Sequence, residues 1–509
     1  MVNAMASKAI LGDCGIIKLL SCVGNFSRDE TNTAFQACQD SVNLVPQKWF
    51  DLEDPLFCNP FTKNGVHEAA ICFRLVESGQ WPSKTGMPFL SFATSKLTQL
   101  AAQSTIKGLD SLDGKSLLNC IRIVSSSHEW GGGAKNRTCR HCGASEAVYG
   151  NSQGIPFLDG FEEIKNAVEE ARSIGGKKIR PLIVVGNPPY SLDSGTCKSN
   201  TTNFSTFDRN AANVFKLDPD VAVLLGPAKT LYKQGARNGG SIAFRRKAFE
   251  GRHIRTLEIY PNAKELYGKS SNLKGGGFRF LWIKEYSGPC TVKIISGGKV
   301  VTERTVQSIM DYSGDISVFI GLDSNEERLA LKISSKQNRS VADFIYSAGC
   351  FAIPTNFIDY RNEQFEGSVK IVLNRGRCGY ISADRISKNV NLVDEWKVAV
   401  PNVWGSGDAK TDVVRFQILH PNVCASDSYS IVHGFRNESE CRSFISFMQT
   451  VPARFAVAVR KRTHHASKNV FSGVPMPDLT RPSWNDKIAS QWLGLTSRDI
   501  EAMKKFLNR

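Results

Sequence analysis

Short apolar runs rich in β-branched residues alternate with segments of helical spacing over the N-terminal half of the chain. Apolar runs between turn signals predict buried strands, and apolar residues at three- and four-residue intervals predict helices. Strands that alternate with helices indicate a parallel α/β sheet. We expect strands at 182–186, 220–225 and 254–260, helices at 68–77 and 160–174, and a strand followed by a helix within 87–100.

A change of pattern divides the chain into two expected domains. After Gly288 the helical spacing gives way to short β-rich segments with frequent glycines, so we place the boundary between about 305 and 335. An α/β domain is therefore predicted over 1–320, with a cysteine-containing, loop-rich insertion at about 105–155. Residues 321–509 are expected to form a mixed α+β, β-rich domain with a helical tail. A helical lead-in at 1–45 rests on the spacing of Ile10, Ile16, Ile17 and Leu20.

The charge balance favours a polyanionic partner. Lys and Arg outnumber Asp and Glu by 64 to 48, which gives a net charge of +16 and a pI near 9.2. An excess of this size suits the phosphate backbone of double-stranded DNA. No apolar run is long enough to span a membrane, and the first residues lack the basic start and apolar core of a signal peptide. The 14 scattered cysteines are expected to be reduced, as in a cytoplasmic protein.

Candidate chemistry is concentrated where the strand at 182–186 ends, in Asn187-Pro188-Pro189-Tyr190. The two prolines stop the strand and restrict the backbone, so the Asn187 amide is expected at the carboxyl edge of the sheet, where ligands bind in open α/β folds. An amide oxygen and a main-chain carbonyl can accept the two hydrogens of a planar amino group, and a Tyr ring offers a face for stacking. This combination suits a flipped-out adenine.

The tetrapeptide, together with the order of weaker motifs along the chain, resembles the N6-adenine DNA methyltransferases of restriction–modification systems. The weaker motifs include His128-Glu-Trp130, Lys274-Gly-Gly-Gly-Phe-Arg-Phe-Leu-Trp282 and Lys468-Asn-Val-Phe-Ser-Gly-Val-Pro475. The resemblance implies a Rossmann-like, S-adenosylmethionine-dependent methyltransferase sheet, followed by a C-terminal target-recognition domain. It also implies a cytoplasmic protein of prokaryotic or viral origin.

The same resemblance implies where the cofactor S-adenosylmethionine would bind. The matching positions lie in the N-terminal segment, in the glycine turn after the first strand and in the second strand. They are Thr33, Asn59, Pro60, Gly65 and Phe92.

Three departures from the family pattern keep a second hypothesis open. Asn59 replaces the acidic residue before the glycine turn, His67-Glu68 replaces an apolar pair, and Lys96 follows the second strand where a carboxylate is expected for the ribose. A cationic cofactor is disfavoured by a lysine at that position. The chain is therefore either a site-specific adenine N6-methyltransferase or a cofactor-deficient DNA-binding subunit that partners an active methyltransferase.

The insertion carries a candidate metal site. Cys139 and Cys142 have the spacing of two zinc ligands on one turn, and His128 or Cys120 could complete the set. Two reduced cysteines in a surface turn are the alternative interpretation. Such a zinc ion would be structural.

A basic cluster marks the C-terminal domain. We expect Arg460, Lys461, Arg462 and Lys468 to contact DNA phosphates. A nuclease site built from Asp384, Glu395 and Lys397 fits poorly with the spacing of known metal-dependent nucleases and is not expected.

Overall fold

The computed structural model describes most of the chain, with gaps. The described residues are 33, 35–81, 86–109, 116–124, 127–132, 137–141, 144, 146–149, 156–174, 178–192, 204–231, 248–249, 251–268, 276–309, 321–336, 339–404, 415–461 and 468–508. Most of the expected lead-in, Cys142 and Arg462 lie outside them. The chain divides into two compact units, Met1–Ser317 and Val318–Arg509. Among the described helices, none combines the length and apolar character needed to cross a membrane.

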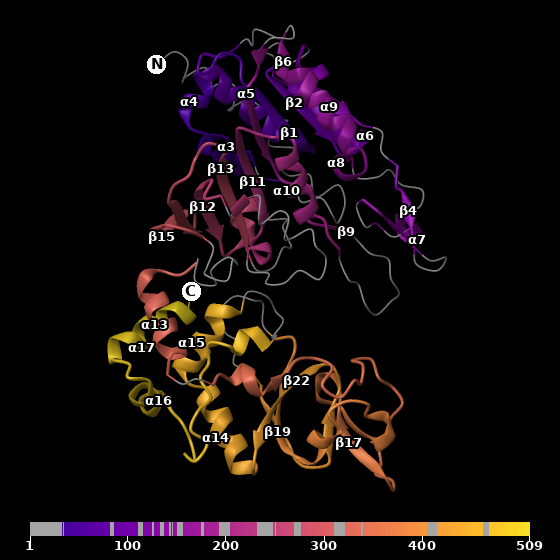
Figure 1. The fold of residues 1–509 in the computed structure, drawn as a ribbon, viewed down its shortest axis with the longest axis vertical. Helices are drawn as coiled ribbons and strands as arrows, with labels where there is room; N and C mark the ends of the chain where they lie inside the picture. Colours follow the sequence, from indigo (N-terminus) through magenta and orange to yellow (C-terminus); the bar gives the residue numbers. More distant parts are fainter. Residues whose placement is uncertain are drawn as a thin grey trace. The chain divides into compact units, whose positions relative to one another are not determined.

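One sheet organises unit 1 (Figure 1). Its nine described strands are β1 (Leu56–Thr62), β2 (Phe89–Ala93), β3 (Ile121–Ile123), β8 (Leu182–Gly186), β11 (Val221–Pro227), β12 (Ile254–Tyr260), β13 (Gly277–Ile283), β14 (Cys290–Ser296) and β15 (Lys299–Val306). They follow the order β15-β14-β12-β13-β11-β8-β1-β2-β3. From β3 to β11 the pairing is parallel, whereas β13 is antiparallel to both β11 and β12.

The strand order identifies the fold. The parallel half follows the doubly wound order 3-2-1-4-5, and the antiparallel β13 between β11 and β12 is the feature that distinguishes methyltransferase sheets from dinucleotide-binding ones. The predicted fold class, an α/β Rossmann-like methyltransferase sheet, is confirmed.

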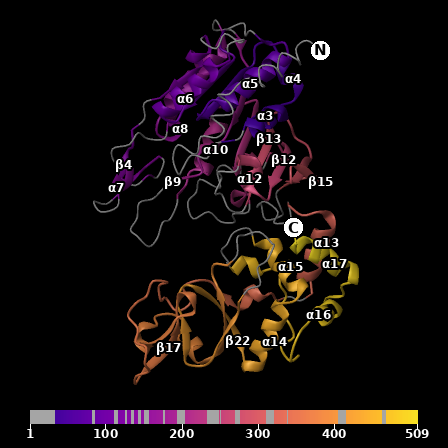
Figure 2. The ribbon, with the colours of Figure 1, turned by 180° about the vertical axis from the view of Figure 1, so that it is seen from behind.

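Helices cover both faces of this sheet (Figures 1 and 2). The helices of unit 1 include α3 (Phe35–Leu44), α5 (Val66–Glu77), α6 (Lys96–Lys107), α8 (Pro156–Asp159), α9 (Phe161–Arg172), α10 (Phe207–Lys216) and α12 (Ala263–Tyr267). Apolar side chains of α3, α5 and α6 share one core with alternate residues of β1, β8 and β11. On the opposite face, Phe207 and Phe215 of α10 pack edge-on against Phe278 and Trp282 of β13.

Helix α6 extends further than the sequence pattern predicts. It continues to Lys107, into a segment expected to be loop-rich, because Ala102 and Ile106 continue its buried apolar face. The other expected helices and strands of unit 1 form within a few residues of their predicted bounds.

Unit 2 combines two small sheets with helices. Its elements include α13 (Ser324–Ser334), β16 (Ile345–Tyr346), β17 (Ser368–Val372), β18 (Cys378–Ser382), β19 (Trp396–Pro401), β20 (Gln417–Leu419), β21 (Val423–Ala425), β22 (Tyr429–Phe435), α14 (Glu438–Met448), α15 (Val451–Arg460), α16 (Asp486–Leu493) and α17 (Ser497–Leu507). The sheets have the orders β16-β22-β19-β20 and β18-β17-β21. The helices close one apolar core and the β17 sheet closes another.

A buried arginine joins the start of the parallel strands. The Arg180 guanidinium donates to the carbonyls of Asp54 (3.0 Å), Pro55 (3.2 Å) and Met87 (2.8 Å), and lies 3.2 Å from the Asp54 carboxylate. Its side chain is 1% exposed. Because these acceptors precede β1 and β2, the guanidinium satisfies backbone groups that would otherwise be buried without partners.

We expect Arg180→Met to lower the free energy of unfolding by about 3–5 kcal/mol, because it leaves a buried carboxylate and several carbonyls unpaired. Urea unfolding followed by circular dichroism measures the loss. Lys165→Met on α9, where the side chain is 38% exposed, is the matched control and should cost about 0.5 kcal/mol or less. Equal losses in the two variants would contradict this role for Arg180.

Candidate active site

The tetrapeptide Asn187-Pro188-Pro189-Tyr190 directly follows β8, in the middle of the parallel half of the sheet. β8 pairs in parallel with β1 on one side and β11 on the other. The tetrapeptide therefore stands at the carboxyl edge, beside the loop that follows β1, as its sequence context predicts. Asn187 is 2% exposed and Tyr190 6%.

Both ends of the Asn187 amide are engaged. Its Nδ2 donates to the Thr33 hydroxyl at 2.9 Å, and its Oδ1 accepts a hydrogen bond from the Tyr190 hydroxyl. Thr33 comes from the N-terminal segment, 154 residues away along the chain. The structure thus brings a residue predicted to bind the cofactor into contact with a residue predicted to hold the substrate.

Aromatic rings surround Tyr190. Its ring centroid lies 5.6 Å from that of Tyr267 and 6.2 Å from that of Phe207. Burial raises the pKa of Tyr190 well above its usual value, so its hydroxyl is a hydrogen-bond donor at any physiological pH. Thr206 fixes the backbone, since its hydroxyl donates to the Pro189 carbonyl (3.1 Å) and its amide to the Tyr190 carbonyl (3.1 Å). In this arrangement the Tyr190 ring is packed inside the protein, in contrast to the expected outward stacking face.

The loop after β1 begins a buried polar cluster. Asn59 accepts a hydrogen bond from the Phe61 amide (3.1 Å) and donates to Glu68 Oε1 (2.8 Å), which also accepts from the Thr62 hydroxyl. Gly65 starts α5 with φ +80°, and a Cβ there would lie 2.9 Å from the Ala102 backbone. Only glycine meets both the conformation and the close approach of α6 at this turn.

Four polar atoms of this region are buried without a hydrogen-bond partner among the described residues: Asn64 Nδ2, His67 Nε2, Glu68 Oε2 and Ser91 Oγ. Ser91 pairs with Asn59 across β1 and β2, so the four atoms belong to neighbouring strand ends and the first turn of α5. Burial, together with the Lys63 ammonium, lowers the pKa of His67 to about 3, so its ring is neutral. Orphaned buried polar atoms are rare and point to a ligand or water.

The two halves of the site meet at Gly186. A Cβ on Gly186 would lie 2.9 Å from Asn59 Oδ1 and 2.9 Å from the Phe61 ring. The missing side chain therefore lets Asn59 lie directly against the strand that carries Asn187.

The remaining residues predicted near the cofactor are placed as follows. Phe92, on β2, and Pro60, on β1, are buried. Lys96 is the exposed first residue of α6, and its ammonium donates to Gln99 Oε1 at 2.9 Å. Thr94 and Ser95 stand between the end of β2 and Lys96. The lysine is thus directed along its own helix.

The other predicted sites are only partly assembled. His128 and Cys139 come together, with Asp159 as a third neighbour that the sequence pattern did not suggest. The partner expected from the motif, Cys142, lies outside the described residues. Cys120 is buried in the core of α5 and α6.

In unit 2, the basic cluster differs from the expected exposed arrangement. Lys461 is 7% exposed, with its ammonium 5.1 Å from the Trp404 ring centroid, and Arg460 packs against Gly473. Lys468 is exposed, and Arg462 is not among the described residues. Apolar stretches of α15 draw Arg460 and Lys461 inward, which the charge pattern did not reveal.

The nuclease interpretation finds no support among the described residues. The Lys397 ammonium is buried and donates to the carbonyls of Val393 (2.9 Å) and Glu395 (2.7 Å). Burial lowers the pKa of Lys397 to about 8. Asp384 is exposed in a different element.

Comparisons with known proteins agree with the motif. No family model matches the chain. It is 24% identical over 311 residues, 54% of this chain and 71% of the relative, to a protein of Mycoplasma pneumoniae named "Uncharacterized adenine-specific methylase". Among solved structures, the type IIG restriction endonuclease BpuSI is 12% identical at a TM-score of 0.40, over 95% of this chain and 66% of that one. The type IIL restriction-modification enzyme MmeI, in complex with DNA, is 10% identical at a TM-score of 0.42, over 97% and 74%.

The resemblance to adenine-specific methyltransferases that the motifs predict is therefore confirmed by the Mycoplasma relative.

Proposed function

We propose that this chain is a DNA methyltransferase that transfers a methyl group to the N6 amino group of adenine. The observation that carries the proposal is the position of Asn187-Pro188-Pro189-Tyr190, at the carboxyl edge of the sheet and directly beside the buried polar loop of β1. The name of the Mycoplasma relative supports adenine as the base. The net charge of +16 supports DNA as the polymer.

Asn187 and the Pro188 carbonyl would bind the amino group of a flipped adenine. Both accept hydrogen bonds, so they hold the two hydrogens of the amino nitrogen and favour a geometry in which its lone pair is available as a nucleophile. The Tyr190 hydroxyl occupies Asn187 Oδ1 in this structure. Substrate binding therefore requires the hydroxyl to turn away, which would also release the Tyr190 ring to stack on the base.

The buried polar cluster fits the amino-acid part of S-adenosylmethionine. When bound, this cofactor supplies a methyl group attached to a cationic sulfonium. The partnerless Glu68 Oε2 would pair with the cofactor ammonium, and the Asn64 amide and the Ser91 hydroxyl are suited to its carboxylate and ribose. Glu68 thus offers the negative charge that Asn59 lacks.

Asn187→Ala is expected to reduce transfer of tritiated methyl groups to mixed-sequence DNA by about 100-fold or more, because it removes one of the two acceptors for the amino group. Filter-bound radioactivity measures the transfer. Asn325→Ala, an exposed asparagine of unit 2, is the matched control and should retain the wild-type rate. Equal rates for Asn187→Ala and the wild-type protein would sink the assignment of the site.

Glu68→Gln is expected to weaken binding of S-adenosylhomocysteine about tenfold or more, which corresponds to the loss of a charge-assisted hydrogen bond. Isothermal titration calorimetry measures the Kd without requiring activity. The control is Glu77→Gln at the exposed end of α5, whose carboxylate is 48% exposed and should leave the Kd unchanged. Equal binding by Glu68→Gln and the wild-type chain would rule out this role for Glu68.

A cofactor-deficient DNA-binding subunit is the second candidate function. It is favoured by the end of β2, where Thr94 and Ser95 stand in place of the carboxylate that the resemblance places there for the ribose. Both hydroxyls are engaged with Thr98 in the first turn of α6, at 3.2 Å. A wild-type chain that binds no S-adenosylhomocysteine in the same calorimetric experiment would favour this function, with a partner methyltransferase doing the chemistry.

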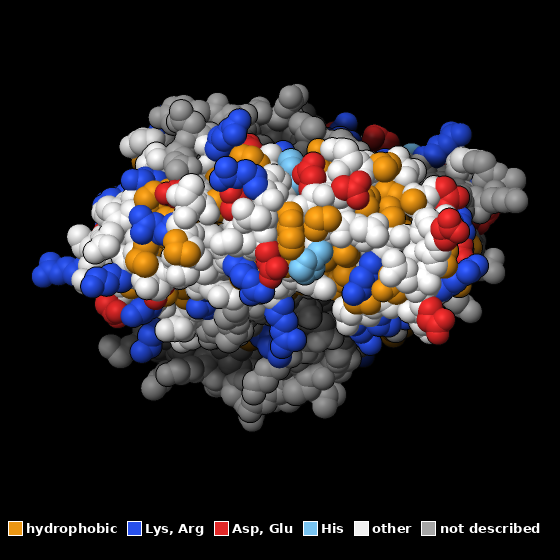
Figure 3. Space-filling view, turned by 90° about the horizontal axis from the view of Figure 1, so that it is seen from below, with side chains coloured by type: hydrophobic (Ala, Val, Ile, Leu, Met, Phe, Trp, Pro, Cys, Tyr) orange, Lys and Arg blue, Asp and Glu red, His pale blue; other side chains and the backbone are white. Residues whose placement is uncertain are grey.

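Unit 2 is proposed to recognise the DNA sequence. Lys and Arg side chains are scattered among Asp and Glu on the face seen in Figure 3, so net charge alone does not mark a contact surface. A β-hairpin tip does: β17 and β18 are joined through Asn374–Gly376, and Arg375 and Arg377 are both exposed there. Arg375 has φ +61°, which bends the tip tightly. A two-stranded ribbon fits the major groove, where arginine can read guanine.

The double variant Arg375→Ala/Arg377→Ala is expected to weaken DNA binding and to lower the slope of log affinity against log salt by about 2, one unit for each lost phosphate or base contact. Fluorescence anisotropy over a series of salt concentrations measures both. The matched control, Arg498→Ala/Lys505→Ala, removes two exposed charges of α17. An equal loss in the two double variants would show a general charge effect and would refute the hairpin assignment.

A further inference from the structure

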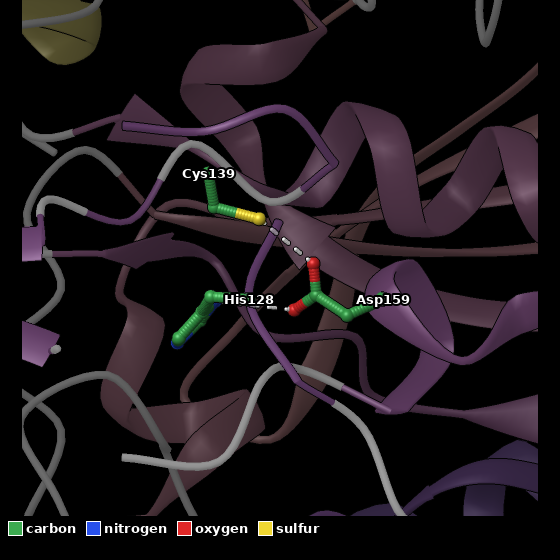
Figure 4. A group of neighbouring side chains, drawn as sticks. All are labelled: His128, Cys139 and Asp159. Atoms are coloured by element: carbon green, nitrogen blue, oxygen red, sulfur yellow. Dashed lines mark hydrogen bonds and ion pairs between the residues drawn. The ribbon is translucent and has the colours of Figure 1, made fainter. Parts of the chain in front are cut away.

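We propose that His128, Cys139 and Asp159 bind a structural divalent metal ion, and that the chemistry of the ligands selects zinc. Their ligand atoms all lie within 4.8 Å of one another, and Figure 4 shows the three side chains converging. The proposal does not depend on the reaction that the chain catalyses.

The distances match a coordination sphere. Cys139 Sγ is 3.1 Å from Asp159 Oδ1, and His128 Nδ1 is 3.5 Å from Asp159 Oδ2. In a tetrahedral zinc site with bonds of about 2.0–2.3 Å, neighbouring ligand atoms stand about 3.3–3.8 Å apart. The three groups therefore need only small adjustments to contact one ion. Thiolate, imidazole and carboxylate together suit zinc better than calcium or magnesium, which prefer oxygen ligands.

Burial and charge favour an ion at this place. The side chains of His128 and Asp159 are 3% and 0% exposed, and Cys139 is buried. A buried carboxylate requires compensation. A divalent cation bound by one carboxylate, one thiolate and one neutral imidazole makes the group electrically neutral. The ring of Trp130, 4.6 Å from that of His128, helps to orient the imidazole.

The surrounding hairpin has little else to hold it together. Strands β4 (Trp130–Gly131) and β5 (Thr138–Cys139) have two residues each. The local apolar cluster consists of Cys139, Ala144 and Leu158, with Trp130 packed against it. The ion pairs of Glu129 with Arg140 and His141 are exposed and contribute little. Two-stranded hairpins of this size are marginal in water, and small units commonly depend on a metal.

Asp159 gives the ion a purpose within the fold. It ends helix α8, whose Phe157 ring packs 4.9 Å from the ring of Phe61, just beyond Asn59 in the candidate active site. The Phe157 carbonyl accepts a hydrogen bond from Asn213 of α10 (2.9 Å). A metal bound by the hairpin and by Asp159 would fasten the insertion to the carboxyl edge of the sheet.

The test is the metal content of the full-length chain, expressed with zinc in the medium and purified without a histidine tag. Mass spectrometry of the elements should find about one zinc per wild-type chain. Cys139→Ser should lose the ion, and Asp159→Asn should weaken binding about tenfold or more in competition with a chromophoric chelator. Cys378→Ser, which alters an exposed free cysteine, is the matched control and should keep the full content.

Cobalt exchange separates loss of a ligand from loss of folding. A cobalt-loaded wild-type chain should show a thiolate-to-metal absorption band, which Asp159→Asn should shift and Cys139→Ser should remove while the far-ultraviolet circular dichroism stays unchanged. A wild-type chain without metal, or an Asp159→Asn chain with wild-type metal affinity and spectrum, would overturn the proposal.

Discussion

The parallel pairing of β1 with β8 is the interaction on which the candidate site depends. Leu56, Phe57 and Cys58 stand opposite Leu182, Ile183 and Val184, so the two strands end at the same edge although more than half of unit 1 separates their neighbours in sequence. The loop of Asn59 and the tetrapeptide of Asn187 then become neighbours. Gly186 allows this contact at side-chain distance, since a Cβ there would collide with Asn59. Polar groups for two ligands are thereby gathered around one strand boundary.

A rearranged charge is the main chemical novelty of this edge. In the family that the chain resembles, the acidic residue precedes the glycine turn, whereas here Asn59 stands there and a carboxylate enters from the first turn of α5. Glu68 is 1% exposed and reaches back to Asn59, with one oxygen bonded and the other partnerless among the described residues. Two departures that look independent in the sequence are therefore in contact. A compensating pair explains both changes better than two separate losses do.

The sequence predicted those parts of the molecule that depend on neighbours along the chain. Strand β8, helix α5 and the turn at Gly65 follow from local apolar spacing and from glycine. Arg180, Thr33 and Asp159 escaped notice because their roles depend on partners far away: Arg180 bonds groups before β1 and β2, and Thr33 meets Asn187. The direction of Lys461 escaped for the same reason, because its burial over Trp404 is a tertiary contact.

The contact between Tyr190 and Asn187 explains how one buried edge can remain intact without a substrate. The Asn187 amide would lose both partners if Thr33 and Tyr190 moved away, and a buried amide without partners is costly. By donating to Oδ1, the Tyr190 hydroxyl takes the place that an amino group of the base would occupy. Its ring meanwhile fills the space between Phe207 and Tyr267. Binding of the base is then an exchange of one hydrogen bond for another, and its selectivity follows, because a base without an amino group at that position would leave the Asn187 oxygen unpaired.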